Sequence, residues 1–346
     1  MTIHQAVLLV GGRGTRMWPL TATVPKGLIP VAGVPFVDLQ IRQLALAGID
    51  EVFLAVGRSQ LEAWEAFAEQ RPGVRLVVED QPLDTAGPVR AALDDLDASF
   101  MVLNGDVFVE ADLTAYLSVV RPEAKATLGL IEVDDTSAYG VVVLDDAGVV
   151  DRFVEKPPAH LAPAKTVNAG IYVMTRSALE IYAAGTLSFE QVVFPSLAAE
   201  RSLHGVVMQG RWLDIGTPEL LLDCTGAVLG GATALHHPAG SHLVDGECLG
   251  TTSGEWSWIA EGAHVGSGAV VEESIVLPGA TVESNALIRR AIVGWDATIG
   301  SGATVTGGSV VGSGAVVGSN TELDRGVRIA PCAHLAPGAV SFSPPE

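Results

Sequence analysis

The chain has 346 residues, too long for one average domain of about 100–200 residues, so we expect two domains. Hydrophobic residues make up 48% and charged residues 17%, which is enough apolar material for a large core and excludes a disordered chain. The formal net charge of −20 argues against a nucleic-acid partner, because such proteins need a basic face.

The cysteines and the N-terminus indicate a cellular compartment. Cys224, Cys248 and Cys332 are far apart and odd in number, which fits neither a disulfide framework nor a zinc ribbon. The first residues lack a basic signal region, and no stretch of about 18 apolar residues exists. We therefore expect a cytoplasmic protein with no membrane partner.

The first 230 residues alternate strand-like and helix-like segments. Strands are expected at Ala6–Val10, Glu51–Val56, Val74–Val78 and Phe100–Leu103, and helices at Phe36–Ala47, Leu61–Ala68 and Pro88–Leu96. This alternation favours an α/β fold with a mostly parallel sheet, in which ligands bind beyond the carboxyl ends of the strands. Gly11-Gly12 and Gly105-Asp106 both follow such ends.

The remainder of the chain repeats an aliphatic residue every six positions. We expect an inner column at Val265, Val271, Leu277, Val282, Ile288, Val293, Ile299, Val305, Val311, Val317, Leu323, Ile329 and Leu335, with five-residue steps at Leu277–Val282 and Ile288–Val293. A hexapeptide period is typical of a parallel β-helix, whose stacked coils bury one continuous column. With a boundary near Gly226–Thr233, the predicted domains are 1–230 and 235–346.

The richest motif follows the first expected strand. It reads Gly11-Gly12-Arg13-Gly14-Thr15-Arg16-Met17-Trp18-Pro19-Leu20-Thr21, with Pro25-Lys26 shortly after. The motif is neither a Walker A loop nor G-x-G-x-x-G. A glycine turn leaves backbone N–H groups facing outward, and Arg16 and Lys26 add two cations, which together suit the phosphates of a nucleoside triphosphate.

This loop resembles the signature of the sugar-1-phosphate nucleotidyltransferases, and four further family motifs appear in order. These are Leu103-Asn104-Gly105-Asp106, Phe153-Val154-Glu155-Lys156-Pro157, Asn168-Ala169-Gly170-Ile171-Tyr172 and Trp212-Leu213-Asp214-Ile215-Gly216-Thr217-Pro218. The resemblance covers about residues 5–222. It implies a Rossmann-like nucleotidyltransferase domain followed by a left-handed parallel β-helix, the hand being implied by the family alone.

The resemblance also implies the reaction and the roles of residues. A nucleoside triphosphate and a sugar 1-phosphate would form a nucleotide sugar and pyrophosphate, with Arg16 and Lys26 as catalytic cations and with Mg²⁺ on Asp106 and Asp214. The sugar phosphate would be bound by Gly140, Glu155, Lys156 and Asn168. The nucleotide would be bound by Leu9, Gly11, Gly12, Gly14, Thr15, Gln81, Thr85, Ala86, Gly87 and Gly105.

Taken alone, several of these residues also fit structural roles. Asp106 also fits a turn cap, Asp214 a satisfied buried carboxylate, Lys156 an exposed loop lysine and Thr85 a helix cap.

The nucleotide and the sugar are less closely defined by the motifs. Leu83-Asp84-Thr85-Ala86-Gly87 and Ser188-Phe189-Glu190-Gln191-Val192-Val193-Phe194-Pro195 look most like the GDP-mannose pyrophosphorylase and heptose-phosphate guanylyltransferase branch. That resemblance implies GTP and a mannose-, heptose- or glucose-like sugar 1-phosphate. Pro25-Lys26-Gly27 departs from the usual Pro-Lys-Pro, and the sugar pocket matches poorly. A sugar-like cyclitol 1-phosphate of the valienol type therefore stays open as the substrate.

Two other functions fit the sequence less well. A non-catalytic regulatory subunit would have lost Arg16, Lys26 or an aspartate, and all are present. An acyltransferase on the β-helix, with His264 in the coils, would need an acyl-donor site that the sequence does not show. His236, His237 and His242 lack acidic or cysteine partners and suit a solvated linker better than a metal site.

We expect the β-helix to drive assembly into a homodimer or a higher homo-oligomer, with a homodimer as the commonest outcome for soluble proteins. Trp256, Trp258 and Trp295 suit such contacts if they are exposed, and a core role fits them equally well.

Overall fold

The computed structural model describes residues 2–230 and 256–341, and the chain divides into two compact units. The first unit comprises residues 1–12 and 37–212, and the second comprises 13–36 and 213–346. His236, His237, His242 and Cys248 lie outside the described residues. The division into domains 1–230 and 235–346 stays a prediction about the catalytic and repeat regions.

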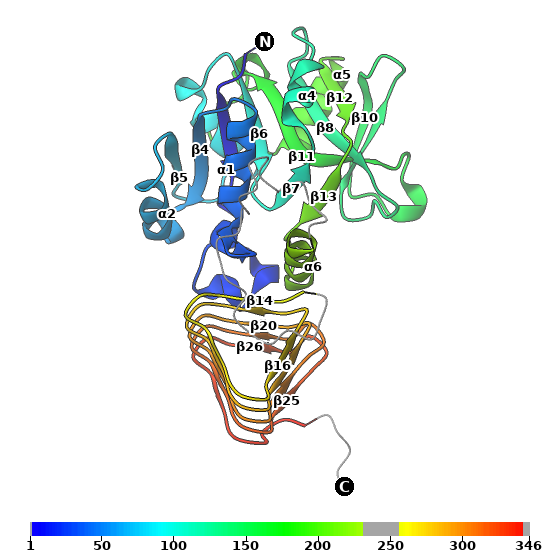
Figure 1. Cartoon of the computed structure of the whole chain (residues 1–346). Helices are drawn as coiled ribbons and strands as arrows, with labels where there is room; N and C mark the ends of the chain where they lie inside the picture. The colour runs from blue at the N-terminus through cyan, green and yellow to red at the C-terminus, as the bar shows by residue number, and fades with distance from the viewer. Residues whose placement is uncertain (1, 231–255, 342–346) are drawn as a thin grey trace. The chain divides into compact units, whose positions relative to one another are not determined.

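The first unit is built on one mixed sheet (Figure 1). Its strands are β1 (Gln5–Leu9), β4 (Glu51–Gly57), β5 (Val74–Glu79), β6 (Ser99–Asn104), β8 (Ala126–Glu132), β9 (Gly140–Leu144), β10 (Val150–Glu155), β11 (Thr166–Thr175) and β12 (Leu203–Val207). The order is β10-β9-β11-β6-β1-β4-β5, with β8 between β11 and β12. Strand β1 runs parallel to β4 and β6, and β4 runs parallel to β5. These are the four strands expected from the sequence, and their parallel pairing is as predicted. Strand β11 runs antiparallel to β6 and β8.

The helices of this unit are short. They are α1 (Phe36–Leu46), α2 (Leu61–Ala68), α3 (Gly87–Ala91), α4 (Leu113–Ser118) and α5 (Phe194–Ala199), and a further short strand is β7 (Val107–Glu110). Gly48 follows α1 with a φ of 82°, the left-handed conformation that glycine adopts most easily after a helix. The single helix predicted over Pro88–Leu96 is wrong. The Asp95 N–H group donates to the carbonyl of Ala92, three residues earlier, instead of to the residue four positions earlier as in an α-helix. A separate 3₁₀ turn therefore covers Leu93–Asp95.

The core of the first unit contains an aromatic cluster where β10, β11 and α5 meet. Phe189 stacks on Phe194 with ring centroids 5.2 Å apart, and Tyr172 packs edge-on against Phe194 at 5.0 Å. All three rings are fully buried. Such pairs add stability beyond the area they bury, so Tyr172 is held firmly next to the segments that carry the sugar-phosphate motifs.

The second unit contains the predicted repeat, whose strands form three parallel sheets (Figure 1). One consists of β14 (Trp258–Ile259), β17 (Ile275–Val276), β20 (Ile292–Val293), β23 (Val310–Val311) and β26 (Arg328–Ile329). The second consists of β15 (His264–Val265), β18 (Thr281–Val282), β21 (Thr298–Ile299), β24 (Val316–Val317) and β27 (His334–Leu335). The third consists of β16 (Val270–Glu272), β19 (Leu287–Arg289), β22 (Thr304–Val305) and β25 (Glu322–Leu323). Three stacked parallel sheets are the architecture of a β-helix, as predicted.

The inner column follows the predicted residues with one correction. Val276, and not Leu277, pairs with Val293, so the five-residue step runs from Val271 to Val276. Leu277 directly follows this strand and is also buried, which is why the sequence does not distinguish the two aliphatic neighbours. The step Ile288–Val293 is confirmed.

Two further pieces of chain belong to the second unit. Helix α6 (Pro218–Leu229) is capped by Thr217, whose hydroxyl accepts a hydrogen bond from the Leu220 N–H group. The preceding strand β13 (Arg211–Asp214) starts in the first unit and ends in the second. Strands β2 (Pro30–Val31) and β3 (Val34–Pro35) form a hairpin whose turn residues, Ala32 and Gly33, both have positive φ.

The tryptophans of the repeat region have internal contacts. Trp258 is buried against Gly33, where a Cβ atom would lie 3.5 Å from the indole, so an exposed Trp258 is wrong. Trp256 packs on Gly226 of α6, and Trp295 is half-buried. Within residues 2–230 and 256–341, no helix is long and apolar enough to cross a membrane.

Candidate functional site

Two glycine segments meet at the carboxyl edge of the parallel strands, as predicted. The Gly105 N–H group donates to the carbonyl of Leu9, and a Cβ atom at Gly105 would lie 2.5 Å from that oxygen. A Cβ atom at Gly11 would lie 2.6 Å from Glu79 Oε1. Only glycine fits at Gly105, because the neighbouring oxygen belongs to the backbone, whereas at Gly11 a side chain would require the Glu79 carboxylate to shift. At Gly12 an added Cβ would have no protein atom within 4 Å, so this position faces open space.

The rest of the signature loop lies in the second unit. Gly14 has φ 60° and begins the 3₁₀ turn Thr15–Met17, and its carbonyl accepts hydrogen bonds from the Met17 N–H and from the Thr21 hydroxyl. A Cβ atom at Gly14 would lie 2.8 Å from Thr21 Cγ2 and 3.1 Å from Lys26 Cβ. This close packing fixes where the Lys26 side chain leaves the backbone.

Arg16 and Asp214 converge in the same unit. The Gly216 N–H group donates to Asp214 Oδ1 at 2.5 Å. A Cβ atom at Gly216 would lie 2.8 Å from that oxygen and 3.0 Å from Arg16 Nη2. The structure therefore brings together one predicted catalytic cation and one predicted metal ligand, beside a glycine that leaves room for both.

Asp106 lies in the first unit, directly after Gly105 and half-buried. Among the described residues, no three or more His, Cys, Asp or Glu side chains gather as an all-protein metal cage. Mg²⁺ needs no such cage when substrate phosphates supply the other oxygens, because one or two carboxylates then suffice. Asp106 and Asp214 have the donor chemistry for that arrangement.

The segment Gln81–Gly87, which contains four residues predicted to bind the nucleotide, is hydrogen-bonded to a distant part of the chain. The N–H groups of Ala86 and Gly87 both donate to the Leu187 carbonyl. The Thr85 hydroxyl accepts from the Phe189 N–H at 2.9 Å. Gln81 is exposed. Helix α3 is capped by Ala86, so the alternative of Thr85 as a helix cap is wrong.

The sugar-phosphate residues lie on β9, β10 and β11, except Lys156, which directly follows β10. Lys156 Nζ lies 3.0 Å from Glu155 Oε1, and 62% of its side chain is exposed, which leaves the ammonium open to a phosphate. A Cβ atom at Gly140 would lie 2.9 Å from Glu155 Oε2, so glycine makes room for that carboxylate. Asn168 donates to the Tyr172 hydroxyl at 3.0 Å and accepts from the Gly170 N–H.

Glu190 is a functional candidate that was not selected from the sequence. Its carboxylate accepts from the hydroxyls of Thr85 at 2.7 Å and Ser188 at 3.2 Å. Burial raises the pKa of the Glu190 carboxyl, and the nearby charge of Glu155 adds to that rise. Burial raises the pKa of the Tyr172 hydroxyl well above its usual value, and the negative charge of Glu190 acts in the same direction. Glu190 falls within the Ser188–Pro195 segment, whose family resemblance is the signal that could have found it.

Comparisons with known proteins show the family of the chain. Residues 5–229 match the family model described as "Nucleotidyl transferase", and residues 250–336 match the "GMPPB C-terminal domain" model. Mannose-1-phosphate guanylyltransferase 1 from Arabidopsis thaliana is 34% identical over 318 residues, covering 84% of this chain and 86% of the relative. A mannose-1-phosphate guanyltransferase from Gibberella zeae is 32% identical and covers 85% and 86%.

Solved structures support the fold over 64% of this chain. The structure of HddC from Yersinia pseudotuberculosis in complex with GMP-PN superposes with a TM-score of 0.55 at 24% identity, covering 64% of this chain and 98% of that one.

Proposed function

The chain belongs to the nucleotidyl transferase family, and from this membership we propose that it transfers GMP from GTP to a sugar 1-phosphate, releasing pyrophosphate. Mannose 1-phosphate is the proposed acceptor. The observation that carries this choice is the 34% identity to a mannose-1-phosphate guanylyltransferase over most of both chains. The chain covers 86% of that relative, and residues 250–336 of the chain match a separate C-terminal domain model, so the similarity is not confined to the catalytic motif.

In this reaction a phosphate oxygen of the sugar phosphate attacks the α-phosphorus, and pyrophosphate leaves. No covalent enzyme intermediate is needed, so catalysis rests on positioning and on stabilising negative charge. Arg16 would hold the leaving pyrophosphate, and its approach to Gly216 and Asp214 supports a place beside the phosphates. Lys26 would contact phosphate in the transition state, since its backbone position is fixed by packing on Gly14.

The sugar end of the site combines one cation with several acceptors. Lys156 would hold the sugar phosphate, and Glu155 and Asn168 would bind sugar hydroxyls. Glu190 would also bind a sugar hydroxyl. Its carboxylate is close enough to interact electrostatically with Glu155 and with Tyr172, and the Tyr172 hydroxyl accepts a hydrogen bond from Asn168. A buried carboxylate is costly unless it accepts several hydrogen bonds, and a sugar hydroxyl would supply one more.

Asp106 and Asp214 would hold Mg²⁺, which supplies charge neutralisation of the phosphates when bound. Gly216 donates to Asp214 and so fixes one of its two oxygens, leaving the orientation of the carboxylate defined before any ligand arrives.

The test is a matrix of the four nucleoside triphosphates against mannose, glucose and heptose 1-phosphates and a valienol-type cyclitol 1-phosphate, with pyrophosphate release as the readout. We expect GTP with mannose 1-phosphate to give the highest kcat/KM. A higher value with another pair would replace the substrate assignment. No pyrophosphate with any pair would overturn the proposed function in favour of a regulatory subunit.

A further inference from the structure

An arginine of the repeat domain reaches the signature loop. Arg328 lies on β26, where its neighbour Ile329 packs toward the inner column and Arg328 points the other way. Arg328 Nη1 donates to the carbonyl of Trp18 at 3.1 Å, and Nη2 donates to Glu219 Oε1 at 3.0 Å. One guanidinium therefore joins the loop to the first turn of α6.

The two acceptors belong to the segments that carry the candidate phosphate and metal residues. Trp18 ends the 3₁₀ turn Thr15–Met17, which contains Arg16. Glu219 is the second residue of α6, and Asp214 lies just before this helix. The Arg328 side chain is 25% exposed, so its bonds are partly shielded from water. A charged donor with planar fork geometry holds two acceptors at a fixed separation better than a flexible ammonium does.

Two other contacts keep the segment 13–36 on the coils. The hydroxyls of Thr23 and Ser313 lie 3.0 Å apart, and Gly33 rests on the Trp258 ring. Neither contact involves α6. Of these three contacts, Arg328 alone links the loop both to the coils and to the helix that follows Asp214.

We propose that Arg328 is a positioning residue for nucleotidyl transfer. It fixes the backbone that carries Arg16 relative to the segment that carries Asp214, so that both side chains approach Gly216 together. This inference rests on the proposed function for the roles of Arg16 and Asp214. It also gives the β-helix a part in the reaction, through one side chain, where the sequence indicates a role in assembly only.

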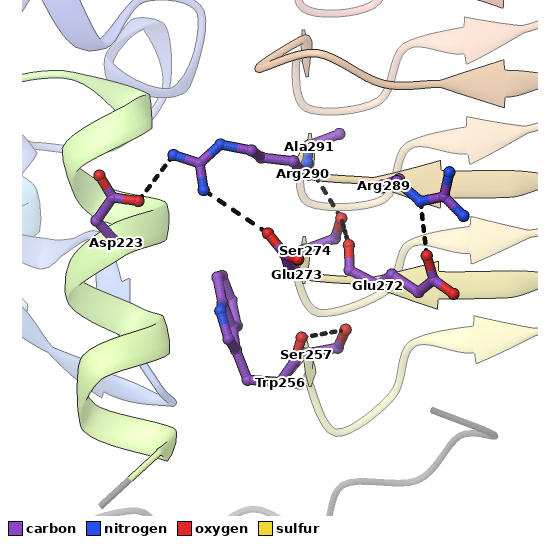
Figure 2. A network of polar contacts seen from close by, with 9 residues as sticks. All are labelled: Asp223, Trp256, Ser257, Glu272, Glu273, Ser274, Arg289, Arg290 and Ala291. Carbon is purple, nitrogen blue, oxygen red and sulfur yellow. Dashed lines mark hydrogen bonds and ion pairs between the residues drawn. The ribbon is translucent and has the colours of Figure 1, made fainter. Parts of the chain in front are cut away.

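A second arginine of the coils also pairs with α6 and provides a matched control. Figure 2 shows Arg290, which also extends from a coil and pairs with Asp223 of α6 at 2.8 Å and with Glu273 at 3.8 Å. These partners lie in α6 and in the neighbouring coil, outside segment 13–36. Replacing Arg290 therefore removes a similar contact between coil and helix without removing the bond to Trp18.

The experiment compares the variants Arg328→Met, Arg328→Lys and Arg290→Met with the wild-type full-length protein. We expect Arg328→Met to lower kcat by about 10-fold or more, because small misplacements of catalytic groups are costly. Arg328→Lys should recover part of that loss, and Arg290→Met should stay near the wild-type value. In Arg328→Met, amide hydrogen exchange should become faster in residues 15–23, and in Arg290→Met it should not.

The proposal is overturned if Arg328→Met matches Arg290→Met in both kcat and exchange. If Arg328→Met does not fold, Arg328→Lys decides: wild-type kcat together with wild-type exchange overturns the proposal. If the wild-type protein shows no transfer with any substrate pair, the proposed function fails, and the exchange measurement still shows whether Arg328 orders the loop.

Discussion

The Thr85 hydroxyl donates a hydrogen bond of 2.7 Å to Glu190 Oε2, joining two segments that lie 105 residues apart. The same hydroxyl accepts from the Phe189 N–H, so one small side chain satisfies a charged acceptor and a backbone donor. The segment predicted to bind the nucleotide and the segment that carries Glu190 are therefore fixed to each other. A change at Thr85 should therefore disturb both the predicted nucleotide-binding segment and the segment that carries Glu190.

Replacing Thr85 with valine keeps the shape of the side chain and removes both hydrogen bonds. We expect a loss of about 1–3 kcal/mol in the free energy of unfolding, because a carboxylate and an N–H group lose a partner in a partly buried place. Thr85→Ser, which keeps the hydroxyl, is the control and should lose much less. Urea unfolding measures both, and equal stability of the valine and serine variants would contradict the assignment.

Glu190 should make stability depend on pH. Its pKa is raised in the folded protein, so the folded state holds this proton more tightly than the unfolded state does. The stability that it contributes is full below the unfolded pKa, about 4.3, and is lost as pH rises through the folded pKa. Glutamine does not titrate. The melting temperature of Glu190→Gln minus that of the wild type should therefore increase from pH 4.5 to pH 7.5, and a flat difference would refute the ionisation of a half-buried Glu190 in this range.

Much of the fold follows from local patterns, and the missing parts are those that depend on distant contacts. Periodicity identifies the parallel strands and nearly the whole inner column, because each side chain there faces the same apolar surroundings as its neighbours six residues away. Leu277 is misplaced because Val276 beside it is just as apolar. The antiparallel pairing of β11 has no local signal.

The candidate site shows the same division. The motifs identify Arg16 and Asp214 separately, whereas their approach at Gly216 depends on how α6 and the loop pack in the second unit. The bond from Arg328 to Trp18 spans 310 residues and leaves no mark in either local sequence.

Two glycines of the signature loop should behave differently when replaced by alanine. Gly12→Ala adds a methyl group with no protein atom within 4 Å, so the fold should be unaffected. If Gly12 faces the nucleotide, KM for GTP should rise by about 10-fold or more through a clash with the ligand alone. Gly14→Ala meets Thr21 at 2.8 Å in a left-handed backbone and should lower both stability and turnover. A normal KM for GTP in Gly12→Ala would remove Gly12 from the nucleotide site.

The metal assignment predicts a large effect of removing either carboxylate charge. Asp106→Asn and Asp214→Asn should each lower turnover at least about 100-fold at saturating Mg²⁺, with native circular dichroism. Asp112→Asn is the matched control, because Asp112 caps α4 through its Oδ1 atom and asparagine caps equally well. Turnover close to that of the wild type in either test variant would show that the carboxylate is not a ligand.

The last prediction separates the two substrates. Arg16 and Lys156 lie in different motifs and in different units of the structure, Arg16 beside Asp214 and Lys156 beside Glu155. Arg16→Ala should mainly lower turnover of GTP, whereas Lys156→Ala should mainly raise KM for the sugar phosphate, because the exposed ammonium is proposed to contact only that substrate.

Lys165→Ala provides the control, since Lys165 is an exposed lysine paired with the exposed Asp134 and should change neither constant. Steady-state kinetics with each substrate varied in turn gives both values. An unchanged KM and kcat for the sugar phosphate in Lys156→Ala would remove Lys156 from the site, and an equal rise in both KM values would show that the lysine contributes only a general positive charge.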